Sequence, residues 1–297
     1  MKRIILTGAR GFVGKALQSF LEKQGYQVEA LRSRSTGKAT MNKATGWIDR
    51  DFLENAFAVI HLAGEPIAQR WTVEAKHKIL ESRRQGTRLL AETLSRLKNP
   101  PGVFISMSGI NRYGFYRPNE VLTESSATST AGFLAEVSVA WEESTLAARQ
   151  SGIRTVSLRT GVVLAASGGA LKTMLPAFRL GLGGPIGSGK QMMSWIRLGD
   201  LVRLIVWVIE NPQCQGPLNA VSPQPVSQKH FAQVLAKKLH RPCFCPAPAW
   251  AVKLAFGQMA EETLLGDLTV LPQVATQQGF VFETPDIDSG LTQALQE

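Results

Sequence analysis

The first fourteen residues constrain the fold most, because they combine a short apolar run with three regularly spaced glycines. The run is Ile4-Ile5-Leu6, and Gly8, Gly11 and Gly14 follow it at G-x-x-G-x-x-G spacing. A short apolar run rich in β-branched side chains and ended by glycine predicts a buried parallel strand. From Phe12 onward, apolar side chains recur at helical spacing. The three glycines are therefore expected at a strand-to-helix turn of an α/β fold.

This turn predicts a dinucleotide site. Glycines allow a tight turn and let a diphosphate approach the backbone amides at the start of the helix, where the helix dipole favours negative charge. The spacing differs from the G-x-G-x-x-G of the usual dinucleotide motif. The alternative is a tight turn that serves packing alone.

The end of the second expected strand, Gln27–Leu31, indicates which dinucleotide is bound. An NAD site places Asp or Glu about 20 residues past the glycines to hold the adenosine ribose. This chain has Arg32 there, with Arg34 and Arg10 expected nearby. A guanidinium can bind a 2′-phosphate that a carboxylate would repel, so the cofactor is predicted to be NADP(H). A solvated Arg-Ser-Arg loop is the alternative.

Strands and helices alternate through the first half of the chain, which predicts a Rossmann-like, doubly wound parallel sheet. Small residues, Ala63-Gly64, follow one strand directly and would let a cofactor lie across its end. His61 in the same strand is interpreted as a packed core histidine. The further strands are expected at Trp47-Ile48, Ala58–Leu62, Gly102–Met107 and Arg154–Leu158, and the helices at Val73–Leu97 and Thr130–Gln150.

The second half is richer in glycine and proline, and it predicts a smaller, mostly helical lobe. We expect residues 1–165 to form the NADP(H)-binding domain and residues 166–297 a substrate or closing lobe, partly interleaved with the first. The Gly181–Gly189 stretch is either a mobile lid or an irregular connection. Gly184–Gln191 nearly matches a phosphate-binding P-loop but lacks the hydroxyl after its lysine, which excludes that motif. Helices are expected at Leu171–Leu180, Leu201–Glu210, Gln228–Leu239 and Ala249–Phe256.

Composition excludes several other classes. The net charge of +10 is spread along the chain without a block of like charges, so no nucleic-acid partner is expected. No apolar run reaches the roughly 20 residues of a membrane span, so no membrane partner is expected. Three cysteines, without histidines at ligand spacing, predict neither disulfides nor a metal site. The chain is expected to be cytoplasmic, a monomer or homodimer, acting on a small-molecule substrate that the sequence leaves unknown.

Further motifs resemble those of the extended short-chain dehydrogenase/reductases. In that family the fifth strand ends in a catalytic Ser or Thr before a Tyr-Gly pair, and Ser108 and Tyr113 match these positions. The family's next helix carries Tyr-x-x-x-Lys, in which the lysine lowers the pKa of a proton-transferring tyrosine. This dyad is missing here, because the three tyrosines, Tyr26, Tyr113 and Tyr116, are followed four residues later by Ala, Arg and Glu. Aligning that helix puts Leu134 and Ser138, or Phe133 and Val137, in its place.

Several longer stretches narrow the resemblance to the atypical "epimerase family" proteins of the YfcH type: Leu62–Ile67, Arg70–Thr72, Ser82-Arg83, Leu158–Leu164 and Phe178–Ile196. The resemblance implies an NADP(H)-dependent oxidoreductase or epimerase-like enzyme with an unassigned substrate. A non-catalytic NADPH-binding sensor or scaffold is the alternative, favoured by the missing dyad. The cofactor-lining residues implied by position are Gly8, Arg10, Gly11, Phe12, Val13, Gly14, Arg32, Ser33, Leu62, Ala63, Gly64, Arg83 and Val162.

Overall fold

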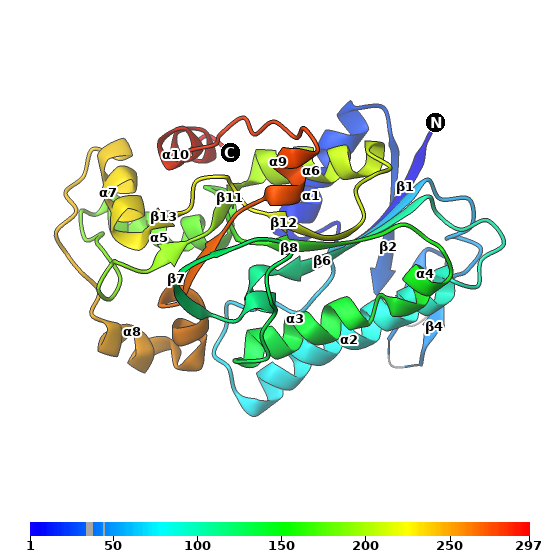
Figure 1. The fold of residues 1–297 in the computed structure, drawn as a ribbon, viewed down its shortest axis with the longest axis horizontal. Coiled ribbons are helices and arrows are strands. Elements are labelled where there is room, and N and C mark those ends of the chain that lie inside the picture. Colours follow the sequence, from blue (N-terminus) through cyan, green and yellow to red (C-terminus); the bar gives the residue numbers. More distant parts are fainter. Residues whose placement is uncertain (34–37, 44) are drawn as a thin grey trace.

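An eight-stranded sheet forms the centre of the molecule, seen in a computed structural model that describes residues 1–33, 38–43 and 45–297 (Figure 1). Its strand order is β12-β8-β6-β5-β1-β2-β3-β4, and all neighbours are parallel except the edge pair β3–β4. This is the predicted doubly wound sheet, with β1 near its middle. The strands are β1 (Arg3–Thr7), β2 (Gln27–Ser33), β3 (Thr40–Asn42), β4 (Trp47–Ile48), β5 (Ala58–His61), β6 (Val103–Gly109), β8 (Thr155–Thr160) and β12 (Gly216–Ala220).

Two apolar layers cover the two faces of this sheet. In β1, the side chains of Ile4 and Leu6 belong to the layer that includes α1 and α6, while Ile5 belongs to the layer that includes α2 and α4. Side chains alternate along a strand, so a strand covered on both faces has to be apolar throughout. The helices are α1 (Phe12–Lys23) and α6 (Leu198–Glu210) on one side, with α2 (Val73–Leu94), α3 (Phe133–Glu143) and α4 (Leu146–Gln150) on the other.

The second half of the chain builds a lobe beyond the strand ends and also completes the main sheet. Strand β12 comes from this half and pairs with β8 at the sheet edge. The boundary at residues 165 and 166 stays a prediction. The remaining elements are β7 (Tyr116–Leu122), β9 (Val162–Ala165), β10 (Met192–Met193), β11 (Trp195–Arg197), β13 (Val226–Ser227) and β14 (Asp267–Val270), the helices α5 (Gly169–Arg179), α7 (Gln228–Lys238), α8 (Ala249–Phe256), α9 (Gln273–Gln277) and α10 (Ile287–Ala294), the 3-10 turn η1 (Ile110–Tyr113) and the π-helical turn η2 (Ala260–Leu264).

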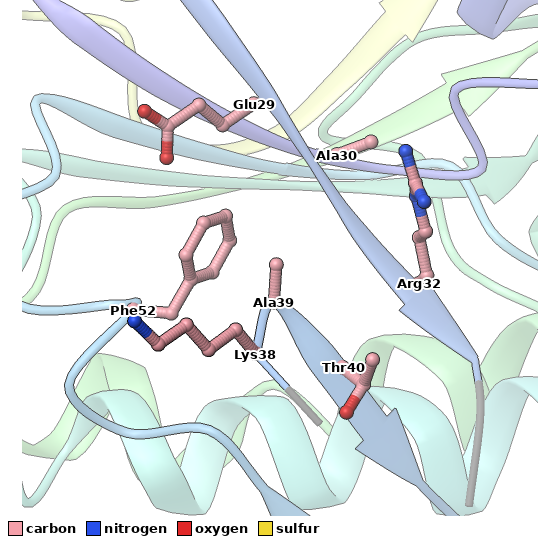
Figure 2. A pocket seen from close by; sticks show the side chains of 7 residues that line it. All are labelled: Glu29, Ala30, Arg32, Lys38, Ala39, Thr40 and Phe52. Carbon is pink, nitrogen blue, oxygen red and sulfur yellow. The ribbon is translucent and has the colours of Figure 1, made fainter. Parts of the chain in front are cut away.

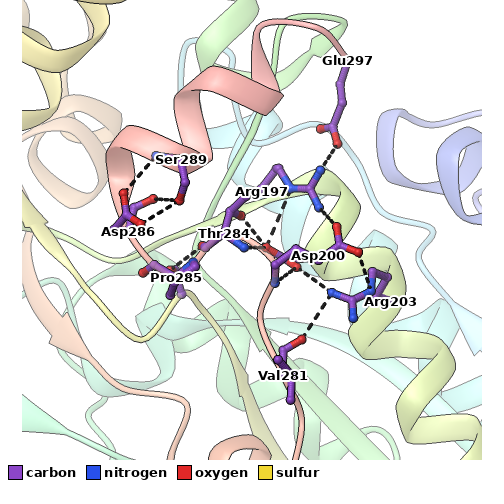
Figure 3. Close-up of polar contacts among 11 residues, drawn as sticks. Arg197, Asp200, Arg203, Val281, Thr284, Pro285, Asp286, Ser289 and Glu297 are labelled. Atoms are coloured by element: carbon purple, nitrogen blue, oxygen red, sulfur yellow. Dashed lines mark hydrogen bonds and ion pairs between the residues drawn. The ribbon is translucent and has the colours of Figure 1, made fainter.

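A buried aspartate fastens the C-terminal segment to α6 (Figure 3). The carboxylate of Asp200 accepts hydrogen bonds from the amides of Glu283 and Thr284, at 2.9 and 3.0 Å, and from the Thr284 hydroxyl. Arg197 lies beside it and donates to the carboxylate of Glu297 at 2.9 Å. A buried carboxylate needs such partners, since an unpaired one costs several kcal/mol.

A second buried carboxylate joins the lobe to α3. Both oxygens of Glu262, in η2, accept backbone N–H groups at the start of α3, from Phe133 and Leu134, each at 2.8 Å. The residue before α3 is Gly132, which has no side chain to cap the helix. A residue more than a hundred positions away therefore supplies the cap, at the helix end where negative charge is favoured.

None of the helices in the described part of the chain combines the length and the apolar character that crossing a bilayer requires.

Candidate functional site

The glycine turn between β1 and α1 is packed so closely that two of its positions exclude any side chain. Gly8 has a φ of 73°, and a methyl group on it would lie 2.9 Å from the backbone nitrogen of Ala63. A methyl group on Gly14 would lie 2.2 Å from the carbonyl oxygen of Gly8. The amide of Gly11 donates to that same oxygen at 2.9 Å, which closes the turn. The loop is thus held against the end of β5, as a dinucleotide loop must be.

The start of α1 carries the donors that a diphosphate requires. Gly11 is the N-cap residue, and no side chain among the described residues caps this helix end. The first-turn amides therefore remain available to an anion, and the exposed Arg10 adds positive charge. Phe12 packs against the backbone of Gly168, where an added methyl group would lie 2.2 Å from its ring. The turn and its surroundings fit the diphosphate of a dinucleotide.

Arg32 and Ser33 lie exposed at the end of β2, in the place predicted for the adenosine ribose. Arg32 shares its strand face with Ala30, whereas Glu29 leaves β2 on the other face (Figure 2). Arg34 lies outside the described residues.

A cavity of about 320 Å³ beside β2 is lined by Arg32 and by Glu29, Ala30, Lys38, Ala39, Thr40 and Phe52. Because none of its lining residues belongs to the glycine turn, we do not identify it with the dinucleotide site.

Arg83 on α2 contacts the turn that follows β5. Its guanidinium is buried, donates to the carbonyl oxygen of Glu65 at 2.9 Å and lies over the ring of Trp141 at 4.7 Å. A methyl group on Gly64 would lie 2.9 Å from its Cζ, so a larger residue there would require the guanidinium to shift. Burial lowers the pKa of Arg83 to about 10, which leaves it charged at neutral pH.

His61 is a packed core histidine, as interpreted from the sequence. Its Nδ1 lies 2.7 Å from the hydroxyl of Thr7, and that hydroxyl accepts the amide of Ala63 at 3.3 Å. Burial, with the nearby charges of Lys43 and Arg83, lowers the pKa of His61 to about 3. The Thr7 hydroxyl therefore joins β1 both to the neutral ring in β5 and to the turn after β5.

Lys43 was missed by the sequence analysis. Its ammonium group donates to the carbonyl oxygen of Ser82 at 3.0 Å and lies against Gly86 of α2. Burial and the charge of Arg83 lower the pKa of Lys43. No local pattern marked this lysine, because it directly follows the short strand β3, for which the sequence gives no strand signal.

Ser108 and Tyr113, the predicted catalytic pair, belong to one buried network. The Ser108 hydroxyl donates to Glu142 at 2.9 Å, and Arg159 donates to both oxygens of Glu142, at 2.8 and 2.9 Å. Arg159 also donates to the Tyr113 hydroxyl at 2.9 Å, and that hydroxyl donates to Asn219 at 2.9 Å. Ser108 is 4% exposed and Tyr113 is fully buried. The structure thus connects the two hydroxyls through an ion pair that the sequence analysis did not identify.

Burial, hydrogen bonds and charge pairing together set the protonation states of Tyr113 and Arg159. Burial raises the pKa of Tyr113, and the opposing influence of Arg159 does not offset it, so the phenol is neutral near pH 7. Burial alone would lower the pKa of Arg159, but its hydrogen bonds and charge pairing with Glu142 outweigh that and raise it. The β-sheet register explains the pairing, because Ser108 of β6 lies opposite Arg159 of β8.

The two residue pairs that were aligned with the family's dyad are buried in α3. Leu134 and Ser138 are both buried in α3, and the Ser138 hydroxyl donates to the carbonyl oxygen of Leu134 at 2.8 Å. Phe133 and Val137 pack in an apolar cluster with Ile79. Neither pair offers a base.

The predicted lining residues are only partly brought together. The glycine turn meets the Leu62-Ala63 backbone, and Arg83 meets Gly64. Phe12 and Val13 pack on the apolar layer beneath α1. Val162 instead begins β9 and packs on the apolar cluster of the second lobe. Its place beside a cofactor remains a prediction.

Comparisons with known proteins agree with this geometry. Residues 4–220 match the model of the NAD dependent epimerase/dehydratase family, and residues 247–294 match a domain of unknown function (DUF1731). The epimerase family protein YfhF of Bacillus subtilis is 34% identical over 298 residues, covering 98% of this chain and 97% of its own. A crystal structure of human epimerase family protein SDR39U1 with NADPH aligns with a TM-score of 0.88 and 32% identity, covering 99% of both chains. A nucleoside-diphosphate sugar epimerase from Corynebacterium glutamicum aligns at 0.80 and 30%, covering 99% of this chain and 58% of its own.

Proposed function

Because the chain belongs to the NAD dependent epimerase/dehydratase family, we propose that it binds NADP(H) and acts as an oxidoreductase or epimerase-like enzyme on a small carbonyl or sugar substrate. The observation that carries the choice of cofactor is Arg32, exposed at the end of β2, where an NAD-binding chain has a carboxylate. The bound NADPH found in the human relative supports the same choice.

Different residues of this chain would bind different parts of the cofactor. The amides at the start of α1 bind the diphosphate, Arg32 and Ser33 bind the 2′-phosphate, and the turn at Leu62–Gly64 holds the ribose. Bound in this way, the cofactor supplies a hydride for reduction or accepts one in oxidation.

The test of cofactor choice is titration calorimetry with NADPH and NADH. Charge-assisted hydrogen bonds contribute about 1.5–3 kcal/mol, so NADPH should bind about 10- to 150-fold more tightly. Arg32→Asp should narrow or reverse this preference. Arg50→Asp makes the same charge change at another exposed arginine of this domain and should leave the preference intact. Equal affinities in the unmodified protein would refute the assignment.

For the chemical step, we keep Ser108 and Tyr113 as the proposed proton relay, with Arg159 and Glu142 as positioning residues. Two observations support this choice: Glu142 and Arg159 hold both hydroxyls in one buried hydrogen-bonded network, and burial raises the pKa of the phenol, which keeps it neutral. A neutral hydroxyl is a poor base but can donate a proton, so reduction by NADPH should be favoured over oxidation near neutral pH.

Ser108→Ala tests this relay against a matched control. It should lower turnover while NADPH affinity stays within about threefold, a difference below about 1 kcal/mol. Ser106 is also buried, on the same strand and the same face, but its hydroxyl is directed to the carbonyl oxygen of Met107 and not to Glu142. Ser106→Ala should therefore keep its turnover. Full turnover in Ser108→Ala would remove that residue from the mechanism.

The missing dyad favours a second candidate, a sensor or scaffold that binds NADPH without turning it over. Tight NADPH binding, with no hydride transfer to a panel of carbonyl compounds and sugar nucleotides, would establish the sensor in place of the enzyme.

A further inference from the structure

Large apolar side chains stand exposed on the second lobe, along two segments that flank each other. They lie at the end of α5 and on the stretch that leads into and through α8, and we call them the α5–α8 apolar face. Most are more than 60% exposed. The members are Leu180 (74%), Leu182 (62%), Phe244 (71%), Trp250 (71%), Leu254 (80%) and Phe256 (46%).

Hydrogen bonds and close contacts show that the two segments run side by side. Arg241 donates to the carbonyl oxygen of Arg179 at 2.7 Å, and the amide of Gly187 donates to Ala247 at 2.9 Å. Between them, a methyl group on Gly184 would lie 2.2 Å from the carbonyl oxygen of Cys245. Both segments belong to the lobe at one end of the molecule, the left end in Figure 1.

The packing of α8 leaves most of its apolar surface without a partner. The helix reads AWAVKLAF, and Val252 is its one buried residue. Trp250 and Leu254 are four residues apart, so they share one side of the helix. A helix this apolar is normally buried in a core or held against another surface.

The charge around this face is positive. No Asp or Glu occurs between residues 211 and 260, a stretch that contains five lysines and arginines: Lys229, Lys237, Lys238, Arg241 and Lys253. Two of them have acidic partners from outside the stretch, Lys238 with Asp288 and Lys253 with Glu261. Lys229, Lys237 and Arg241 are exposed on the same lobe, as is Arg179 beside Leu180.

This charge argues against a second copy of the chain as the occupant. A symmetric dimer through the α5–α8 apolar face would place the same cations opposite each other, and like charges across an interface oppose association. An anionic occupant that accepts apolar side chains between its charges would complement both features of this face.

We propose that the α5–α8 apolar face docks on an anionic lipid surface. Trp250, Leu254 and Phe244 enter the boundary between headgroups and acyl chains, and the lysines and arginines around them meet the lipid phosphates. Tryptophan and phenylalanine beside lysine are the composition of segments that lie in a membrane interface without crossing it. We expected no membrane partner from the sequence because it contains no apolar run long enough to span a membrane. Docking on the membrane surface does not require such a run.

The test is co-sedimentation of the full chain with vesicles of phosphatidylcholine, with and without about 30% phosphatidylserine. Binding should require the anionic lipid and weaken as salt is raised. A variant carrying both Trp250→Ser and Leu254→Ser should lose at least about tenfold in bound fraction. Val281→Ser, a comparably exposed residue (72%) on another segment, is the control and should stay within about twofold. Circular dichroism of each variant confirms that the fold is kept.

Four outcomes would overturn the proposal. One is the absence of binding to anionic vesicles, and another is an equal loss in the Val281→Ser control. A dimer in solution that Trp250→Ser dissociates would assign the face to a second copy. Binding to polyglutamate that matches vesicle binding and survives the double substitution would assign the cations to an acidic protein instead.

Discussion

Replacing Gly14 by alanine sets two effects of opposite sign against each other. Gly14 lies in the first turn of α1, where alanine is the better helix former by about 1 kcal/mol. The added methyl group, however, would lie 2.2 Å from the carbonyl oxygen of Gly8, and its other near neighbours are also backbone atoms of the loop. Overpacking of this kind costs about 1–3 kcal/mol, so the net loss of folding stability should be small, about 0–2 kcal/mol.

Cofactor affinity should fall much further than stability. Because no side chain can rotate away to make room, the loop and the start of α1 have to separate. That movement displaces the amides that the diphosphate would bind. Loss of even one charge-assisted hydrogen bond removes about 1.5–3 kcal/mol, which corresponds to about 10- to 150-fold in the dissociation constant of NADPH.

The assay is titration calorimetry with NADPH, combined with thermal unfolding of the protein alone. Gly102→Ala is the control, since a methyl group there would make an ordinary contact of 3.5 Å with the carbonyl oxygen of Phe57. It should change neither measurement appreciably. If Gly14→Ala binds NADPH within threefold of the unmodified protein, the glycine turn is not the diphosphate site and the reasoning fails.

Three further predictions follow from buried or exposed charges. Glu262→Ala leaves two amides of α3 without acceptors and should lower the free energy of unfolding by about 2–4 kcal/mol, whereas Glu261→Ala removes only a half-exposed ion pair and should cost less than about 1 kcal/mol in urea unfolding. His61 has a pKa of about 3 in the folded chain and an ordinary pKa of 6.5 in the unfolded chain. Between these pH values the unfolded chain binds a proton at His61 and the folded chain does not. Stability should therefore fall as pH drops below about 6.5, by up to about 1.4 kcal/mol per pH unit, and His61→Gln should remove that slope. Lys190 is exposed, and Lys190→Ala should leave NADPH affinity unchanged in calorimetry; magnesium-dependent ATP hydrolysis lost in this variant would reinstate the P-loop.

The first strand and helix were predictable because each residue's local preference agrees with its place in the fold. Ile4-Ile5-Leu6 is apolar on both faces, and the helix from Phe12 has one apolar side. The helix expected over Thr130–Gln150 instead divides into α3 and α4. The break falls where the hydroxyls of Ser144 and Thr145 bond to backbone carbonyls of the preceding turn, a competition that periodicity does not report.

Two strands of the sheet, β12 and β3, could not be predicted from local pattern. Strand β12 begins Gly216-Pro217, a pair that reads as a turn. Proline is tolerated there because β12 lies at the sheet edge, a fact that only the tertiary fold supplies. Likewise, Thr40–Asn42 carries no strand signal of its own and becomes β3 by pairing with β2.

In the candidate site, too, some features were predictable from the sequence and others were not. Sequence placed Ser108 at the end of its strand but could not say which face it takes, since a shift of one residue reverses the face. Its partner Glu142 comes from α3, and Arg159 from the neighbouring strand β8, so their meeting depends on register and helix packing together. The glycine turn is predictable because one local stretch of the chain forms it. The buried hydrogen-bond network is not, because its residues come from five elements: β6, η1, α3, β8 and β12.

Movement of the whole second lobe cannot be what opens the proposed cofactor site. The lobe is joined to α3 by the buried Glu262 and contributes β12 to the central sheet, so it cannot swing away as a rigid body without breaking buried hydrogen bonds. The Gly181–Gly189 stretch is also tied down, since the amide of Ile186 donates to Gln228 at 2.7 Å and its carbonyl oxygen accepts from Gln191 at 3.0 Å. These bonds favour an ordered connection over a mobile lid. Substrate entry should then depend on side-chain movements near the strand ends, and turnover should be insensitive to Gly181→Ala beyond its effect on stability.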